Sequence, residues 1–348
     1  MPRTLTFYGI DPSAETFTAC PYQPGARGSS EATTFENSAD GVAAFVATLP
    51  EDRTALIVGV ENTGVYSETL CYELHEAGVP LVLLDPSAIH RAFSKGPKTD
   101  ARDAAKIAEY TSRYEDTLTR WQPRAVVVEQ IRVLLSTREH LVGQRTASKN
   151  ARKSLSRKVI QTPGANAALE SVAGHLTAEI KRIEGEIRRL VSTHPTLAQG
   201  VSLLLGVPGV GLLLASQMRV LTSGFEDLPG YRKLAYRLGI APHPYPAPPR
   251  RAGSGKSVWR PDRSRGYGPH VTRKLLHLAA RSVRAHEPRS KRYFEEKVAA
   301  GKATRLVLNN LANRVLRVMC GVLASGVPYR PDYVSLAPQL LTSHRQSG

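Results

Sequence analysis

Four acidic residues in the first third of the chain could together perform metal-dependent chemistry. Asp11 and Glu61 each end an apolar run, and Asp100 and Asp103 are spaced for one face of a helix. A carboxylate beside a buried apolar run is costly unless a cation offsets its charge. Such a set can hold two divalent cations about 4 Å apart, which activate an attacking oxygen and stabilise a leaving oxygen in phosphoryl transfer. The pattern is typical of a metal-dependent nuclease core.

The alternative is that each carboxylate is an ordinary strand-end or capping residue. Asp100 near a helix start is favoured by the helix dipole in any case. Asp85 follows another aliphatic run and is a candidate fifth carboxylate, but Asp85-Pro86 is more simply a turn.

The elements around the acidic residues predict an α/β domain. Short strands are expected at 4–10, 16–22 and 31–36, a helix at 40–49, and buried strands at 55–60 and 80–84 on either side of a helix at 66–76. Thr99 can cap a final helix that carries Asp100 and Asp103 in its first turn. The resulting order, βββαβαβα, is the one that a ribonuclease H-like fold requires.

Residues from Trp121 to about Gln199 predict two long helices, because Pro163-Gly164 is the only sharp break in a helical pattern. Basic residues recur at spacings of three, four and seven in the first of them: Arg138, Arg145, Lys149, Arg152, Lys153, Arg157 and Lys158. We interpret this stripe as a phosphate-contacting or subunit-pairing face. A solvated helix face is the alternative.

The remainder of the chain combines a glycine-rich turn, a long loop and further helices. The turn at 206–211 precedes a helix and could present backbone N–H groups of Gly209 and Gly211 to a phosphate, as in helix-hairpin-helix contacts with DNA. An ordinary helix-helix turn is the alternative. A Pro-, Gly- and Arg-rich loop at 241–269 is long enough to suggest a function. Helices are expected from about Val271 and from 303 to 324, the latter with an apolar core stripe.

Composition favours a polyanionic partner. The chain has 348 residues, a net charge of +17 and a pI near 10, and neutralising phosphates releases condensed counterions. No apolar run approaches the roughly 20 residues of a membrane span. The three cysteines have no zinc spacing and are expected to be reduced thiols. We therefore expect a soluble, cytoplasmic protein that binds nucleic acid.

The loop contains a segment, 252–257, that superficially suggests a nucleotide-binding P-loop. Its required first glycine would fall at Arg250, and no buried strand precedes it, so an ATPase is excluded. Instead, Arg250, Arg251 and Lys256 surround a serine, Ser254, that is a possible nucleophile toward a phosphate. A basic loop without chemistry is the alternative.

Several of these motifs together resemble the IS110 family of transposases over nearly the whole chain. They are Gly9-Ile10-Asp11, Glu61-Asn62-Thr63-Gly64, the segment 98–104, the glycine-rich turn 206–211, and Leu238-Gly239-Ile240-Ala241-Pro242 with a later Ser-Gly. The resemblance implies a RuvC-like domain whose Asp-Glu-Asp-Asp set is Asp11, Glu61, Asp100 and Asp103. It also implies a C-terminal transposase domain with a catalytic serine.

The same resemblance implies a recombinase that cuts and rejoins donor and target double-stranded DNA through a serine-DNA intermediate. It would use Mg²⁺, as two ions that Mn²⁺ could replace, and would be guided by a noncoding RNA from its insertion element. The family's oligomers imply a dimer to tetramer in which one subunit's serine completes another's acidic site. Ser254 is the nearest match to the family's serine and Ser257 the second, because several residues are inserted before them.

We therefore expect a RuvC-like domain at 1–121, a basic long-helix connector or oligomerisation region at 122–199, a mainly α transposase domain at 200–335, and a tail at 336–348. The expected nucleic-acid contacts are Arg145, Lys149, Arg152, Lys153, Gly209, Gly211, Arg250, Arg251 and Lys256. Two alternatives stay open: a junction endonuclease that uses the acidic site alone for hydrolysis, and a noncatalytic binding protein that descends from a transposase.

Overall fold

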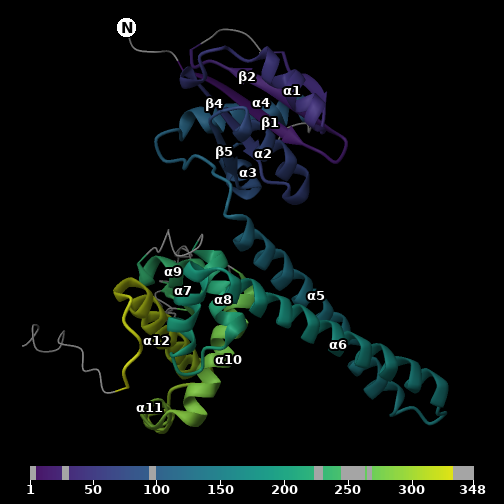
Figure 1. Cartoon of the computed structure of the whole chain (residues 1–348), viewed down its shortest axis with the longest axis vertical. Helices are drawn as coiled ribbons and strands as arrows, with labels where there is room; N and C mark the ends of the chain where they lie inside the picture. The colour runs from purple at the N-terminus through teal and green to yellow at the C-terminus, as the bar shows by residue number, and fades with distance from the viewer. Residues whose placement is uncertain are drawn as a thin grey trace, which may run out of the picture. The chain divides into compact units, whose positions relative to one another are not determined.

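The computed structural model describes residues 5–25, 31–93, 99–222, 230–243, 263–264 and 269–331. The chain divides into two compact units, residues 1–123 and 124–348, each of which has its own core (Figure 1).

The first unit is built on a five-stranded mixed sheet. Its strands are β1 (Thr6–Pro12), β2 (Thr16–Tyr22), β3 (Thr33–Glu36), β4 (Leu56–Glu61) and β5 (Leu81–Leu84). The order across the sheet is β3-β2-β1-β4-β5, in which β1, β2 and β3 pair antiparallel and β4 and β5 continue parallel to β1. This topology is the ribonuclease H-like fold, as the element order predicts.

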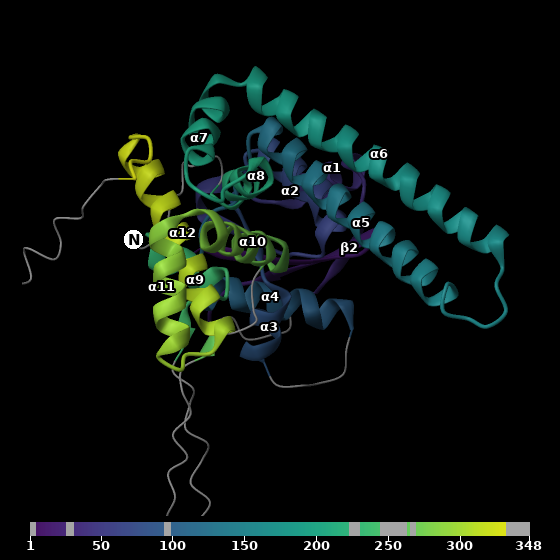
Figure 2. The same cartoon turned by 90° about the horizontal axis from the view of Figure 1, so that it is seen from below.

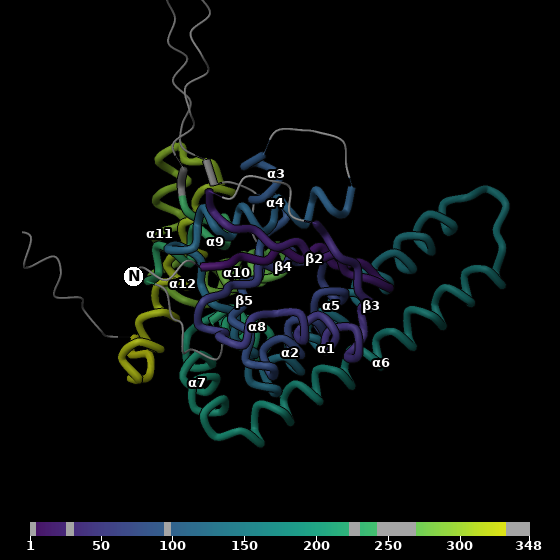
Figure 3. The backbone as a smooth tube through the Cα atoms, turned by 90° about the horizontal axis from the view of Figure 1, so that it is seen from above, coloured from purple at the N-terminus to yellow at the C-terminus, as the bar shows by residue number. Residues whose placement is uncertain are grey.

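Helices cover both faces of this sheet. On one face lie α1 (Ala39–Thr48) and α2 (Glu68–Glu76), and on the other lie α3 (Pro86–Ala92) and α4 (Asp100–Arg113). Short 3₁₀ turns, Arg53–Ala55 and Gly64–Ser67, precede β4 and α2. Figure 3 shows the strands between these two pairs of helices. The buried strand residues divide accordingly, with Val58 and Val60 in one apolar cluster and Ile57 in the other.

Two glycines determine how closely α4 approaches the sheet. Gly9 and Gly59 are opposite each other on β1 and β4. A Cβ at Gly9 would lie 2.1 Å from the Ala104 carbonyl oxygen, and one at Gly59 would lie 2.0 Å from the Thr111 hydroxyl. A side chain at Gly9 would therefore push the backbone of α4 away, and one at Gly59 would displace the Thr111 side chain. The motif Gly9-Ile10-Asp11 does not by itself predict this packing role of Gly9, because it depends on which helix lies over the strand.

The prediction that Asp85-Pro86 forms a turn is wrong, because these residues begin α3. The Asp85 carboxylate accepts hydrogen bonds from the Ser87 backbone N–H at 2.8 Å and from the Ser87 hydroxyl at 2.7 Å. Proline directly after a capping aspartate is a helix-start signal, since the missing N–H would have had no partner there. The hydrogen bonds from Ser87 lower the pKa of Asp85.

The second unit contains two long helices and a helical bundle. The long helices are α5 (Val126–Leu155) and α6 (Pro163–Thr193), which lie side by side as an antiparallel hairpin (Figure 2). The bundle comprises α7 (Pro195–Leu205), α8 (Leu212–Leu221), α9 (Tyr231–Arg237), α10 (His270–His286), α11 (Pro288–Ala299) and α12 (Thr304–Ser325). One core joins the bundle to the start of α5 and the end of α6.

The long apolar helix α12 belongs to this core. Leu311, Val315, Met319 and Val322 are buried, as the apolar stripe predicts. By length and hydropathy α12 could cross a membrane, but helices at the centre of soluble bundles have the same composition. Its buried stripe and its packing against α7, α9, α10 and α11 identify it as a core helix.

Candidate active site

The carboxyl ends of β1 and β4 place two of the predicted acidic residues next to each other. These strands are parallel neighbours, with Ile10 opposite Val60, and Asp11 and Glu61 follow these two residues directly. Both are half-buried. The first turn of α4 supplies the other two, Asp100 and Asp103, after Thr99, whose hydroxyl caps the helix by accepting from the Arg102 N–H at 3.4 Å.

The electrostatics of Asp11 show that the structure brings the four carboxylates together. The pKa of Asp11 is raised to about 6, first by burial and then by the negative charges of the other three. Those charges belong to Glu61, Asp100 and Asp103 in order of decreasing effect, and a side-chain hydrogen bond with Glu61 adds to the shift. Residues far apart in the sequence thus form one acidic edge, defined as Asp11, Glu61, Asp100 and Asp103.

The acidic edge has the donor chemistry that Mg²⁺ and Mn²⁺ prefer, because all four ligands are carboxylate oxygens. A cation would also offset the repulsion that raises the pKa of Asp11. Within the described part of the chain, no three carboxylate, histidine or cysteine side chains already converge as a metal-ligand set. Asp100 is exposed at the helix start, so rotation of its side chain could bring it toward Asp11.

Lys106 is a neighbour of the acidic edge that the sequence analysis did not identify. Its ammonium group lies 2.8 Å from the Asp103 carboxylate, one turn further along α4. The pair is partly buried and neutralises some of the negative charge at one side of the acidic edge. The spacing of three residues between Asp103 and Lys106 on a predicted helix could have indicated this ion pair.

The basic stripe of α5 is partly neutralised by α6. Arg138 forms an ion pair with Glu184 at 2.7 Å, and Arg152 forms one with Glu170 at 2.8 Å. Such pairs join the two helices and leave fewer charges for phosphates. Arg145 is half-buried, whereas Lys149 and Lys153 are exposed and make no ion pair with any described residue. These two lysines, together with the exposed Arg157 and Lys158, are therefore available to a polyanion.

The glycine-rich turn connects α7 to α8 in a helix-hairpin-helix arrangement, but its first predicted contact residue has a packing role. Gly209 has a φ of +79°, and a Cβ there would lie 2.8 Å from the Ala279 carbonyl oxygen on α10. Gly211 precedes α8 and would meet nothing within 4 Å if it carried a Cβ. Only Gly211 therefore has open space beside it.

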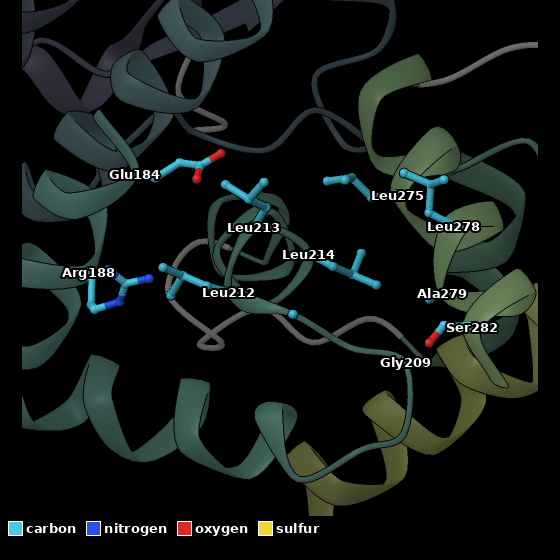
Figure 4. Close-up of a pocket in the computed structure, with 11 residues that line it drawn as sticks. Glu184, Arg188, Gly209, Leu212, Leu213, Leu214, Leu275, Leu278, Ala279 and Ser282 are labelled. Carbon is cyan, nitrogen blue, oxygen red and sulfur yellow. The ribbon is translucent and has the colours of Figure 1, made fainter. Parts of the chain in front are cut away.

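A cavity of about 360 Å³ adjoins this turn (Figure 4). Leucines of α8 and α10 form much of its wall, including Leu213 and Leu275, while Glu184 and Arg188 of α6 lie on one side. Glu184 already pairs with Arg138. The cavity is thus more apolar than a phosphate site usually is.

Two family models match this chain. The DEDD transposase model of IS110 elements, described as "Transposase", matches residues 8–158, and a model described as "Transposase IS116/IS110/IS902 family" matches residues 201–295. The chain belongs to the IS110 transposase family. The resemblance in the sequence motifs is therefore confirmed, and it supports an enzyme that acts on DNA.

A curated relative and two solved structures are similar to parts of this IS110-family chain. The relative is the "Insertion element IS110 uncharacterized 43.6 kDa protein" of Streptomyces coelicolor, 27% identical over 192 residues, which are 53% of this chain and 44% of the relative. The chain thus aligns with less than half of that relative's length.

The solved structures are Thermus thermophilus RuvC alone and T. thermophilus RuvC in complex with a Holliday junction substrate. Both are 16% identical and cover 34% of this chain, with 100% and 99% of their own chains covered and TM-scores of 0.27 and 0.28. With TM-scores this low, the fold assignment rests on the strand order of the sheet.

The predicted nucleophile lies outside the described residues, as do Ser257, Arg250, Arg251 and Lys256. The segment 244–262, which carries Ser254, begins and ends at a two-stranded ladder. Its strands are β6 (Pro242–His243) and β7 (Arg263–Ser264), with Pro242 opposite Ser264. The described residues that flank the segment, His243 and Arg263, are therefore paired with each other.

Proposed function

We propose that this IS110-family transposase cuts and rejoins donor and target DNA through a covalent serine-DNA intermediate. The observation that carries the proposal is the acidic edge, where four carboxylates from β1, β4 and α4 come close enough to raise the pKa of Asp11. Burying like charges is unfavourable, and such sites recur where a cation and a phosphate are to be bound.

In the proposed reaction, the Ser254 hydroxyl oxygen attacks the scissile phosphorus. The new Ser254 oxygen–phosphorus bond forms as the bond to the 3′ oxygen breaks, and the departing 3′ oxygen takes up a proton. The serine proton passes to a carboxylate of the acidic edge. Mg²⁺ bound by Asp11, Glu61, Asp100 and Asp103 would polarise the phosphate and stabilise developing charge. A 3′-hydroxyl of the partner DNA then displaces Ser254, so that strands are joined without ATP.

The finer parts of the proposal follow from the family resemblance. A noncoding RNA of the element would guide target choice, and a dimer or tetramer would combine the acidic edge of one subunit with Ser254 of another. We further propose the RuvC-like domain at 1–121, the connector at 122–199, the transposase domain at 200–335 with its serine segment, and a tail at 336–348. Lys149 and Lys153 would contact nucleic acid, and the action would take place in the bacterial cytoplasm.

The test is to incubate the purified protein with Mg²⁺, the element's RNA, and labelled donor and target DNA, and to look for a protein-DNA adduct on a denaturing gel. We expect an adduct that is lost in both Ser254→Ala and Asp11→Asn, with DNA binding retained. An adduct that persists in Ser254→Ala but not in Ser257→Ala would move the nucleophile to Ser257.

Two other outcomes would contradict the proposal. Cleavage without an adduct would favour a junction endonuclease that uses water. Binding without cleavage, while an active relative works in parallel, would favour a noncatalytic descendant of a transposase.

A further inference from the structure

Three basic residues follow one another along one side of α10. Arg273, His277 and Arg281 are four positions apart, so together they extend over about 12 Å of the helix. Arg281 is exposed and makes no ion pair with any described residue, and His277 is half-buried. The sequence of α10 contains no aspartate or glutamate. The His277 imidazole therefore lies between two guanidinium groups on a helix without negative charge.

Helix α12, which packs against α10, adds a fourth basic residue to this group (Figure 2). Arg305 is exposed in the first turn of α12 and also makes no ion pair with a described residue. Burial first, and then the charges of Arg273, Arg305 and Arg281, lower the pKa of His277. Three arginines from two helices thus lie within electrostatic reach of one imidazole. We call Arg273, His277, Arg281 and Arg305 the basic cluster.

The basic cluster reduces the stability of the free protein. Arg305 lies in the first turn of its helix, where the helix dipole disfavours a cation, and the sequence of α12 contains no acidic residue. Lys274 shows how a cation of α10 can be neutralised, because its ammonium group lies 2.6 Å from the Glu139 carboxylate of α5. Arg281 and Arg305 have no such partner among the described residues. A bound anion would offset the unfavourable energy.

The aromatic rings of α11 help to define which anion the basic cluster fits. The guanidinium group of Arg284 lies 4.2 Å from the centroid of the Phe294 ring, and that of Arg314 lies 3.7 Å from the centroid of the Tyr293 ring. Both rings are therefore covered and are not free to stack on a base. Positive charge that extends along a helix fits a row of phosphates, as in a nucleic-acid backbone, better than it fits a single small anion.

We propose that the basic cluster binds the phosphate backbone of double-stranded DNA without reading its sequence. DNA is the expected ligand because both family models that match the chain are transposase models. The inference goes beyond the proposed reaction, since it concerns binding alone and holds whichever group attacks the phosphate. It also adds a surface in the bundle to the exposed lysines of α5, Lys149 and Lys153.

The experiment measures binding of the full-length protein to a labelled DNA duplex of arbitrary sequence, in the presence of a chelator. It compares the wild type with the double variant Arg281→Gln, Arg305→Gln. The double variant Arg284→Gln, Arg314→Gln is the matched control, because it removes the same charge from the same two helices at exposed arginines that stack on aromatic rings. Affinity is titrated from about 50 to 200 mM salt, and urea unfolding measures the stability of each protein.

We expect the Arg281→Gln, Arg305→Gln variant to bind the duplex about 10-fold more weakly and to lower the slope of log affinity against log salt by about 2, since each phosphate contact contributes about 0.9 to that slope. Its stability should be unchanged or higher. The control should keep the wild-type slope and unfold at lower urea, because it loses two cation–π contacts. A second duplex of unrelated sequence should give the same losses.

An unchanged salt slope in the Arg281→Gln, Arg305→Gln variant would overturn the inference, and so would an equal fall in the control, because the arginines would then act only through net charge. A loss confined to one duplex sequence would contradict backbone binding. If binding to an RNA of the same length were weakened while duplex DNA binding stayed at the wild-type level, the basic cluster would be an RNA site and the inference would fail.

Two features keep the test independent of folding and of the proposed function. Each single variant, Arg281→Gln or Arg305→Gln, should lower the slope by about 1, so the singles decide the question if the double variant does not fold. A protein that binds DNA through the basic cluster but forms no adduct with Mg²⁺, RNA and DNA would overturn the proposed reaction and leave this inference in place.

Discussion

The two units of this transposase concentrate charge of opposite sign. Residues 1–123 contain 17 acidic and 10 basic side chains, whereas residues 124–348 contain 37 basic and 13 acidic ones. The net charge of +17 is therefore the sum of a negative first unit and a strongly positive second unit. A strongly positive unit of this kind favours a polyanionic partner such as nucleic acid.

The charges that shift pKa values also differ in sign between the two units. In the first unit burial and neighbouring carboxylates raise the pKa of Asp11 to about 6. In the second unit the pKa of His277 is lowered, first by burial and then by nearby positive charges. These charges belong to Arg273, Arg305 and Arg281 of α10 and α12. Each unit thus holds like charges together at a cost, and a ligand of opposite charge offsets that cost.

In both units, the like charges that favour ligand binding reduce the stability of the ligand-free protein. A divalent cation would relieve the acidic edge, and a phosphate backbone would relieve the basic helices. Removing a like charge that has no ion-pair partner, from the acidic edge or from the exposed lysines of α5, should therefore weaken ligand binding while it stabilises, or leaves unchanged, the free protein.

The largest effect is expected for the acidic edge. Asp11→Asn should reduce Mg²⁺-dependent DNA cleavage by about 10³-fold or more, because several kcal/mol of charge stabilisation in the transition state depend on the bound cation. The measurement is single-turnover cleavage under saturating DNA. Asp85→Asn is the matched control, since this carboxylate follows the neighbouring strand and only caps α3. Full activity in Asp11→Asn would remove the acidic edge from catalysis.

The next largest effect is expected for the packing of α4 against β1 at Gly9. Gly9→Ala should lower the free energy of unfolding by about 2–4 kcal/mol, because its Cβ would overlap the α4 backbone. Thermal or urea unfolding measures this loss. Gly143→Ala on α5 is the control, since nothing lies within 4 Å of the added Cβ. Unchanged stability in Gly9→Ala would mean that α4 does not pack against β1 as described.

The stability of the folded protein should depend on pH through the protonation of Asp11. Asp11 has a folded pKa of about 6 against an ordinary value of 3.8, so the folded protein binds the proton more tightly than the unfolded chain does. The stability associated with this proton is fully present below pH 3.8 and is lost as the pH rises through about 6. At pH 8 without metal, we expect Asp11→Asn to be about 1–2 kcal/mol more stable than the wild type.

The measurement is urea unfolding of both proteins from pH 4 to pH 8 in the presence of a chelator. The difference between them should shrink toward pH 4, and Mg²⁺ at pH 8 should stabilise only the wild type. A wild type that is the more stable protein at pH 8 in chelator would contradict the electrostatic account of the acidic edge.

The smallest effect is expected for the exposed lysines of α5, Lys149 and Lys153. The double variant Lys149→Gln, Lys153→Gln should weaken nucleic-acid binding about 3- to 10-fold and reduce the slope of log affinity against log salt by about 2. A salt titration of binding measures both quantities. Arg138→Gln is the contrast, because its ion pair with Glu184 joins α5 to α6. That variant should lower thermal stability with little change in the salt slope.

The sequence predicted the elements that have strong local patterns. Apolar runs that end in Asp11 and Glu61 identify β1 and β4, and Thr99 marks the start of α4. The apolar stripe from Leu308 to Val322 identifies α12 as a core helix. Helices α3, α7, α9 and α11 were not predicted, since short helices have few repeats of their periodicity from which they can be recognised.

The candidate site was only partly predictable. The four carboxylates could be chosen because residue type and spacing are local properties. Lys106, the roles of Gly9 and Gly59, and the convergence of Asn309 and Asn313 on Ile240 could not, since each depends on which backbone lies opposite. For the same reason the sequence places Arg138 in a stripe interpreted as a phosphate-contacting or subunit-pairing face, whereas in the structure it pairs with Glu184.

By itself, the sequence determined the transposase family, the order of strands and helices in the first unit, and the identity of the acidic residues, because these follow from composition, motifs and local periodicity. Only the tertiary structure decided that Asp11 lies within electrostatic reach of Asp100 and Asp103, and that Asn309 and Asn313 of α12 both donate to the Ile240 carbonyl. Such contacts join residues distant in sequence, and the way helices and strands pack together decides which of them meet.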